Sequence, residues 1–214
     1  MRVSILGTGR MGTGLVRVLG EMIPDLQWGS RSLAKVRQKI RETEGISGLI
    51  QPVTNETALE AEVIFPTFWY RDLLPWAAEH KSQLSGKILV DIANPFTSDF
   101  TAFTLDWGTS AAEELQRLLP ETKVVGAFKN TFFSVLEQPL HQGLTSDVFV
   151  TSDHEEAKAC VMALLQGIPF RVLDGGGLQN NRTLERMTLF EREVALRYGS
   201  YPYVSFRLFG MGTD

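Results

Sequence analysis

The chain begins with the stretch Arg2-Val3-Ser4-Ile5-Leu6-Gly7-Thr8-Gly9-Arg10-Met11-Gly12, in which a short apolar strand runs directly into glycines. The spacing G-x-G-x-x-G is typical of the strand-to-helix turn of dinucleotide-binding folds. Gly7 permits the tight turn, Gly9 lets the backbone approach a pyrophosphate, and Gly12 lets the helix pack close to the sheet. The N–H groups at the start of that helix then face the phosphates. The stretch predicts phosphate binding, and the alternative is a glycine-rich turn without a ligand.

The end of the second predicted strand distinguishes between the two nicotinamide dinucleotides. Residues 26–29 form this strand, and Ser30 and Arg31 follow it, with Lys35 one helical turn later. An NAD site usually carries an acidic residue about 20 residues after the glycines, which binds the ribose 2′-hydroxyl. Here a hydroxyl and two cations suit a 2′-phosphate instead. We therefore expect NADP(H). The alternative is that Arg31 and Lys35 are solvated surface charges.

Composition narrows the class of protein. The 214 residues suffice for one large α/β domain with a small appendage. The formal net charge of −4 argues against nucleic acid as a partner. We see neither a signal peptide nor a run of about 20 apolar residues, so we expect no membrane partner. The single cysteine, Cys160, excludes an intramolecular disulfide, fits a reducing cytoplasm, and is expected to be a buried apolar side chain rather than a reactive thiol.

Strands and helices alternate along the chain, which predicts an α/β fold of the Rossmann type, with a doubly wound, mainly parallel sheet and a small C-terminal helical lobe. After the first strand, further strands are expected at 26–29, 49–53, 63–67, 87–92, 123–128, 147–151 and 170–174, the last closing the main sheet. A long helix is expected at 179–198, followed by an edge strand at 204–209. We expect a dinucleotide-binding domain at residues 1–175 and a C-terminal lobe at 176–214.

Ligands bind at the carboxyl ends of the strands in such a sheet. The candidate segments are therefore Gly7–Gly12, Ser30-Arg31, Thr67–Tyr70, Ala93-Asn94 and Phe128–Asn130. The aromatic residues Phe68 to Tyr70 either wall the site or pack structurally. Lys129 either faces an anionic group of a substrate or cofactor or is a solvated lysine.

The sequence contains no motif typical of a metal site, a hydrolase or a P-loop. The three histidines, His80, His141 and His154, are far apart in sequence and have no cysteine partners, so we expect no metal site. A G-x-S-x-G elbow is missing, and no G-K-[ST] follows the glycines, so neither hydrolase chemistry nor a P-loop is indicated.

Several segments together resemble the F420-dependent NADP reductases over nearly the whole chain. They are residues 6–12, Gly29-Ser30-Arg31 with Lys35, 124–130, 147–153 with 156–158, 170–178, Asn181-Arg182, Leu184-Glu185 and 197–199. The chain departs from the family pattern at Phe68-Trp69-Tyr70, Lys129 and Gly175–Gly177. It is also similar to the cytoplasmic domain of membrane ferric reductases, without their membrane helices.

The resemblance implies NADP(H) binding, a deazaflavin facing the nicotinamide, and a C-terminal lobe that helps to form a homodimer. By position, Thr8 to Met11 would hold the pyrophosphate, and Ser30, Arg31 and Lys35 the 2′-phosphate. Thr67 to Tyr70, Asn94 and Ala127 would lie along the ribose and nicotinamide. The full set of expected cofactor-binding residues is Gly7, Thr8, Gly9, Arg10, Met11, Gly12, Ser30, Arg31, Lys35, Thr67, Phe68, Tyr70, Asn94 and Ala127.

The expected function is a cytoplasmic NADP(H)-dependent oxidoreductase that exchanges a hydride with coenzyme F420 or with a flavin, FMN or FAD. Such a transfer requires no side-chain acid or base, so we assign no catalytic residue and name Lys129 only as a candidate for orienting the acceptor. One alternative is a non-catalytic NADPH-binding sensor or partner subunit. Another is a reductase of a small carbonyl or imine, with Lys129 or Tyr70 as proton donor.

Overall fold

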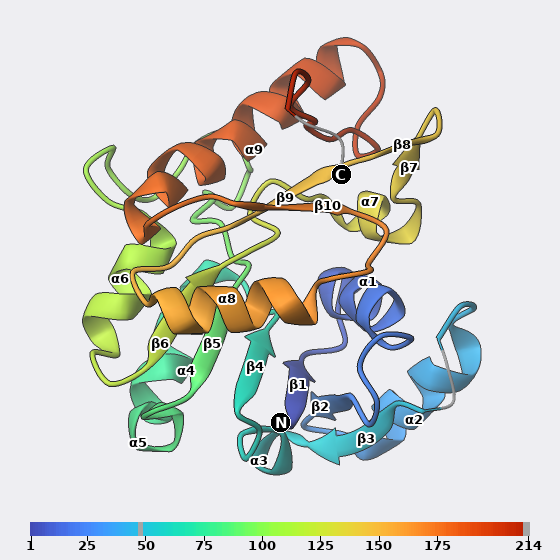
Figure 1. Ribbon diagram of the computed structural model, residues 1–214, viewed down its shortest axis with the longest axis vertical. Coiled ribbons are helices and arrows are strands. Elements are labelled where there is room, and N and C mark those ends of the chain that lie inside the picture. Colours follow the sequence, from blue (N-terminus) through green and yellow to red (C-terminus); the bar gives the residue numbers. More distant parts are fainter. Residues whose placement is uncertain (47–48, 212–214) are drawn as a thin grey trace.

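The computed structural model describes residues 1–46 and 49–211 (Figure 1). Its centre is a six-stranded parallel sheet in the order β3-β2-β1-β4-β5-β6. The strands are β1 (Val3–Leu6), β2 (Gln27–Ser30), β3 (Gln51–Thr54), β4 (Val63–Pro66), β5 (Ile88–Asp91) and β6 (Lys123–Gly126). The chain reverses its direction of travel through the sheet between β1 and β4, which creates a crevice at their carboxyl ends. The predicted Rossmann-type α/β fold is confirmed.

Helices cover both faces of the sheet. Alternate residues of each inner strand enter opposite cores: Ile5 and Phe65 pack with α1 and α8, whereas Leu6 and Ile64 pack with α3, α4 and α6. This double burial explains the near-continuous apolar character of the strands. The helices are α1 (Arg10–Leu19), α2 (Leu33–Glu42), α3 (Asn55–Ala58), α4 (Tyr70–Glu79), α5 (Lys81–Leu84), α6 (Ala111–Leu118), α7 (Phe133–Glu137) and α8 (Glu155–Leu164).

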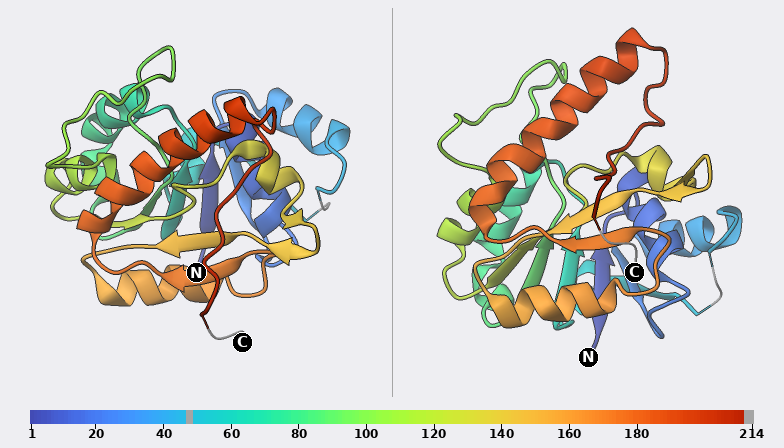
Figure 2. Two further views of the ribbon diagram at one scale, coloured as in Figure 1. Left: turned by 90° about the horizontal axis from the view of Figure 1, so that it is seen from above. Right: turned by 45° about the horizontal axis from the view of Figure 1, so that its top comes forward.

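Two strands expected in the main sheet lie outside it. β9 (Asp147–Val150) and β10 (Arg171–Asp174) form a separate parallel pair that crosses the edge of the main sheet (Figure 2). Their link to β6 is one antiparallel bridge between Gly126 and Thr151. A Cβ on Gly126 would lie 2.6 Å from Thr151 Oγ1, so glycine permits the close crossing. The expectation that 170–174 closes the main sheet is therefore wrong.

The C-terminal part begins with a short 3-10 helix, η1 (Leu178–Asn180), and continues into the long helix α9 (Asn181–Arg197). This agrees with the helix expected at 179–198. The edge strand expected at 204–209 is wrong, since this segment forms no strand. It is extended and runs beside β9, where the Asp147 N–H donates to Phe206 O at 3.0 Å. The sequence reading also missed α7 and the hairpin of β7 (Leu140–His141) and β8 (Leu144–Thr145).

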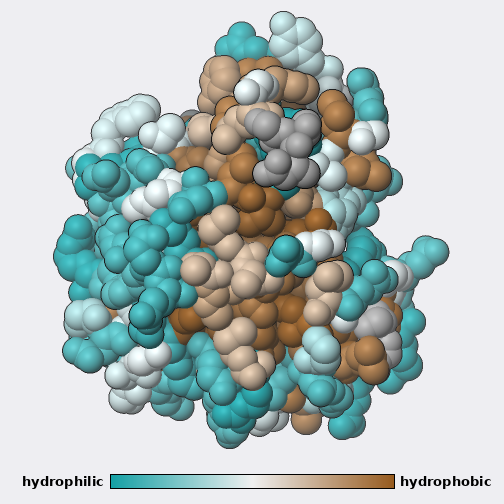
Figure 3. Space-filling view, in the orientation of Figure 1, coloured by the Kyte–Doolittle hydropathy of each residue, from teal (hydrophilic) through white to brown (hydrophobic). Residues whose placement is uncertain are grey.

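Figure 3 shows a hydrophobic band down the middle of the face that carries β10 and α8, flanked by hydrophilic surface. Leu208 and Phe209, from the C-terminal extended segment, are exposed. Within residues 1–46 and 49–211, no helix has the length and apolar character to cross a membrane.

Candidate functional site

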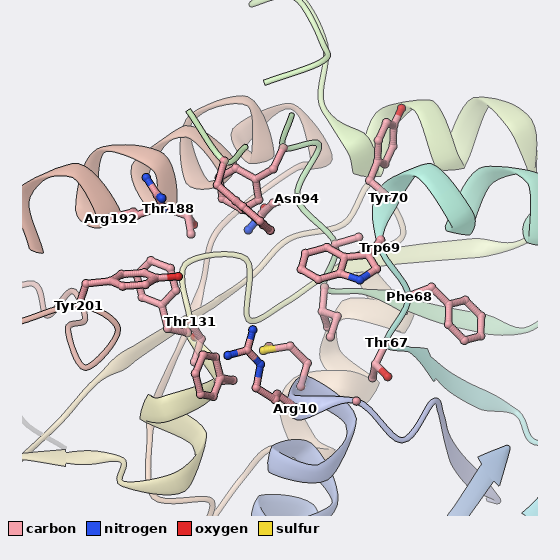
Figure 4. A pocket seen from close by; sticks show the side chains of 18 residues that line it. Arg10, Thr67, Phe68, Trp69, Tyr70, Asn94, Thr131, Thr188, Arg192 and Tyr201 are labelled. Carbon is pink, nitrogen blue, oxygen red and sulfur yellow. The ribbon is translucent and has the colours of Figure 1, made fainter. Parts of the chain in front are cut away.

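A cavity of about 250 Å³ lies at the carboxyl ends of β1, β4 and β5, between the start of α1 and the helix α9 (Figure 4). It therefore occupies the crevice that the strand order creates. Its lining comprises Gly9, Arg10, Met11, Thr67, Phe68, Trp69, Tyr70, Ile92, Ala93, Asn94, Phe96, Phe100, Thr131, Phe132, Phe133, Thr188, Arg192 and Tyr201. Most of these side chains are aromatic or apolar. Two are cationic, and the lining residues include no carboxylate.

The glycine loop between β1 and α1 is held in place by hydrogen bonds from Trp28 and Thr67. Gly7 has a φ of +109°, a left-handed conformation that favours glycine, and its carbonyl accepts a hydrogen bond from Trp28 Nε1 at 2.8 Å. Thr67 Oγ1 donates to Leu6 O at 2.7 Å and lies beside both Gly7 and Gly12. A Cβ on Gly12 would lie 2.2 Å from Gly7 O. Thr67 therefore braces the loop.

Gly9 differs from the other two motif glycines. A Cβ built on it would meet nothing within 4 Å, so its backbone faces open space at the cavity. Gly9 is the N-cap of α1, and among residues 1–46 and 49–211 no side chain caps this helix. The first N–H groups of α1 therefore have no partner within the helix and face the position where an anion would bind.

The residues expected at a 2′-phosphate lie away from this cavity, at the end of β2. Ser30 Oγ accepts from Ser32 N–H at 3.3 Å, and Ser32 in turn caps α2 by accepting from Lys35 N–H at 3.3 Å. The side chains of Arg31 and Lys35 are exposed, and within the described chain neither forms an ion pair with a carboxylate. Their role in binding a 2′-phosphate stays a prediction.

The side chains of the three consecutive aromatic residues after β4 point in different directions. Figure 4 shows the Trp69 indole facing the cavity, whereas the Phe68 ring points away and packs edge-on against Trp76 at 5.1 Å. Tyr70 also points away from the cavity, and burial together with the nearby Glu114 raises its pKa to about 12. Trp69 is thus the aromatic side chain of this trio with its ring in the cavity.

Lys129 is neither a cavity residue nor a solvated lysine. Its ammonium is fully buried and donates to Asp91 Oδ2 at 2.5 Å, Ala93 O at 2.5 Å and Glu185 Oε1 at 3.1 Å. Burial opposes the charged form, but the two carboxylates outweigh it, and the pKa of Lys129 lies above its ordinary value. Burial raises the pKa of Glu185, and Lys129 offsets only part of this effect. The expectation that Lys129 orients an acceptor directly is wrong, because no face of its ammonium is free.

The backbone explains why Lys129 turns inward. Phe128 has a φ of +54°, unusual for a bulky residue, and its ring is enclosed against Phe170. This reversal after β6 directs the next side chain beneath the cavity floor. The carbonyl of Lys129 then accepts from Asn94 Nδ2 at 2.7 Å and from Thr188 Oγ1 at 2.5 Å, so it positions two residues that do line the cavity.

One face of α9 carries polar residues that form hydrogen bonds with the rest of the chain or line the cavity, and the sequence analysis assigned none of them a role. Asn181, Glu185, Thr188 and Arg192 are spaced four, three and four residues apart and therefore share a helix face. Asn181 Nδ2 donates to Thr151 Oγ1 at 2.7 Å, and Glu185 Oε2 accepts from the Ala111 N–H at the start of α6 at 3.0 Å. The helical spacing of these polar residues was the available signal.

The remaining expected residues divide between cavity and core. Asn94 lines the cavity, and its Oδ1 is buried without a hydrogen-bond partner in the described structure. Ala127 is fully buried in the core and is not part of the lining. Cys160 is half-buried, with its Sγ 3.5 Å from Met1 Sδ. Over residues 1–46 and 49–211, no three His, Cys, Asp or Glu residues cluster in a way that would hold a metal ion.

Comparison with known proteins finds reductases of similar sequence. A family model described as NADP oxidoreductase, coenzyme F420-dependent, matches residues 2–95. An F420-dependent NADP reductase of Methanocaldococcus jannaschii is 32% identical over 213 residues, covering 94% of this chain and 95% of the relative. The metalloreductase STEAP3 of Rattus norvegicus is 30% identical over 191 residues, covering 88% of this chain and 36% of that protein.

Among solved structures, a protein of Arthrobacter sp. FB24 to which F420-dependent NADP reductase activity is ascribed superposes with a TM-score of 0.80. Its sequence is 25% identical, and the alignment covers 97% of this chain and 99% of that chain. The similarity thus includes α9 and the segment that follows it as well as the central sheet.

Proposed function

This chain belongs to the F420-dependent NADP reductase family, and from that premise we propose that it transfers a hydride between NADP(H) and coenzyme F420, or a flavin in its place. One observation carries the proposal. A single cavity is bounded on one side by the uncapped start of α1, which suits a dinucleotide, and on the other by aromatic side chains, which suit a second flat ring.

The residues present fit a dinucleotide. Gly9 leaves room for a pyrophosphate beside the N–H groups of α1. Asn94 offers a buried oxygen that accepts no hydrogen bond from any described residue, and it is suited to accept one from the amide group of a nicotinamide. Arg31 and Lys35 are two cations at the end of β2 that pair with no carboxylate in the described part of the chain, and a 2′-phosphate is expected to lie there.

When both rings are bound, the nicotinamide supplies or receives the hydride and the second ring is its partner. The chain's own part is to bind, orient and exclude water. Lys129 holds Asn94 and Thr188 in place through its carbonyl, and Trp69 and Tyr201 supply apolar walls. Hydride transfer between two such rings requires alignment at about 3–3.5 Å rather than a side-chain acid or base.

The proposal of a carbonyl or imine substrate is weaker. Such a reaction normally needs a proton donor near the substrate. Lys129 is sealed away from the cavity, and Tyr70 points out of it with a pKa raised to about 12 by burial. The two donors suggested by the sequence are therefore unsuited to that chemistry.

Steady-state oxidation of NADPH by the purified protein tests the proposal. We expect turnover with F420, and comparison with FMN and FAD identifies the preferred ring. NADH with the same acceptors is the control for the 2′-phosphate. Tight NADPH binding without turnover on any acceptor would instead support a non-catalytic NADPH sensor or partner subunit.

We also propose that the chain acts in the cytoplasm as a homodimer through its C-terminal lobe, taken as residues 176–214. Tyr198 and Phe209 are strongly exposed, and such side chains favour burial in a protein contact. Light scattering coupled to size-exclusion chromatography tests the dimer, with Phe209→Ser as a variant that should shift the population toward monomer.

A further inference from the structure

The polar face of α9 ends in a cation, Arg192, that forms neither a hydrogen bond nor an ion pair with any residue the structure describes. Asn181, Glu185 and Thr188 each form hydrogen bonds to the sheet domain. Arg192, one turn further along the same face, lines the cavity. Its Nε is buried and has no hydrogen-bond partner within the described residues, and its guanidinium lies over the Tyr201 ring at 5.5 Å from the ring centroid.

The neighbouring carboxylates do not neutralise Arg192. Glu193 pairs with Arg197 at 2.5 Å. Glu191 is 3% exposed, both of its oxygens are unpartnered in the described structure, and burial raises its pKa to about 9, so it is neutral near pH 7. A half-buried guanidinium without a counterion has lost hydration, and among the described residues only the Tyr201 ring compensates for part of that loss. An anionic group of a ligand would replace it.

Arg192 lies on the side of the cavity opposite to the dinucleotide motif. Figure 4 shows Arg10 on α1 at one side of the cavity and Arg192 on α9 at the other. The Arg10 guanidinium lies over the Phe133 ring, 4.0 Å from its centroid. Arg10 belongs to the glycine loop, where a pyrophosphate is expected to lie. Arg192 lies with Thr188 and Tyr201, on the side left for the second ring.

We propose that the hydride acceptor binds as an anion and that Arg192 binds its negative group, which makes Arg192 a determinant of acceptor specificity. This inference rests on the proposed function. Arginine suits the role because its planar fork forms two hydrogen bonds to a phosphate or an ionised oxygen. The negative group has two sources in this class of ligand: a phosphate on the side chain, or an ionised hydroxyl on the ring.

Equilibrium binding of four fluorescent probes tests the inference without relying on turnover. The probes are riboflavin, which is neutral, FMN, which adds a phosphate, 8-hydroxy-5-deazariboflavin, which adds an ionisable ring hydroxyl, and F420, which has both. For Arg192→Met we expect F420 to bind about 10- to 100-fold more weakly, together with FMN if the phosphate is the bound group or with the hydroxydeazariboflavin if the ring hydroxyl is, whereas riboflavin changes less than about 2-fold. Arg192→Lys should recover part of the loss because it keeps the charge.

The four probes distinguish the two sources of the negative group. A loss confined to FMN and F420 assigns the phosphate, whereas a loss confined to the hydroxydeazariboflavin and F420 assigns the ring hydroxyl. Arg197→Met, on an exposed arginine of the same helix, is the matched control and should change no probe's affinity. An equal loss for riboflavin and FMN overturns the inference, because Arg192 would then merely pack against the ring. An equally large loss of NADPH affinity also overturns it.

Failure of the inference is distinct from failure of the proposed function. If the wild-type protein oxidises NADPH with F420 or FMN and Arg192→Met binds all probes as tightly as wild type, the inference alone fails. If the wild-type protein binds and reduces none of these rings, the proposed function fails and the inference fails with it.

Discussion

Replacing Lys129 by methionine tests the buried ion cluster most directly. The substitution leaves Asp91 and Glu185, both 0% exposed in their side chains, without the cation that lies between them. Removing one partner of a buried ion pair costs about 3–5 kcal/mol, because the remaining charge is buried without compensation. Asp91 still accepts from Ala93 N–H at 2.9 Å and Glu185 from Ala111 N–H at 3.0 Å, so part of the compensation survives. We expect a loss of about 4 kcal/mol in the free energy of unfolding at pH 8.

The sign of the pH dependence follows from Glu185. Burial and the nearby Asp91 raise the pKa of Glu185 above its ordinary value, and removing Lys129 takes away the charge that lowers it, so the folded variant retains a proton that the unfolded chain releases. The free energy of unfolding of the variant therefore falls as pH rises from about 4. Protonated carboxyls carry no buried charge, so the deficit relative to wild type should be small near pH 4 and full at pH 8.

Urea unfolding followed by tryptophan fluorescence at pH 4.5 and pH 8 measures both effects. The exposed Lys81→Met is the matched control and should change stability by less than about 0.5 kcal/mol. The neutral triple variant Asp91→Asn, Lys129→Met, Glu185→Gln should recover most of the loss at pH 8, since no buried charge remains. A loss below about 1 kcal/mol at pH 8, or one that is the same at both pH values, would refute the reasoning.

Three further predictions concern the glycine loop, the cofactor and Glu191. Gly9→Ala should leave the stability of the fold unchanged, because its Cβ would meet nothing within 4 Å, but it should weaken NADPH binding. Gly12→Ala should lower both the stability and the NADPH affinity, because its Cβ would lie 2.2 Å from Gly7 O. Thermal unfolding and NADPH titration compare the two variants. Arg31→Ala should weaken NADPH by about 1–3 kcal/mol and leave NADH nearly unchanged in parallel titrations, and equal losses would remove Arg31 from the 2′-phosphate site. Burial raises the pKa of Glu191 to about 9, so the stability of the wild-type protein should fall as the pH rises from the pKa of an unfolded glutamate toward 9. Glu191→Gln should abolish this decline and be more stable than wild type at pH 9 by on the order of a few kcal/mol. Parallel curves of stability against pH for the two proteins would contradict this prediction.

The sequence by itself determined the fold class and the position of the cofactor motif, because both depend on local patterns. The apolar strand before Gly7 and the spacing to Gly12 are contiguous, and steric needs of single glycines fix the turn between them. Residues at the ends of β1, β4 and β5 were also named correctly as neighbours, because the carboxyl ends of parallel strands meet at one edge. Thr67, Trp69 and Asn94 lie in the cavity for this reason.

Only the tertiary structure decided what the side chains do. Lys129 follows a strand end just as Asn94 does, but the left-handed Phe128 turns it inward to two carboxylates from distant parts of the chain. β10 pairs with β9 instead of β6, a choice between long-range partners that local patterns do not encode. Arg192 joins the cavity because α9 packs back across the sheet domain through Asn181, Glu185 and Thr188. Strand ends can be located from short segments, whereas burial and charge pairing depend on residues far apart in sequence, and these decide which side chains reach a ligand.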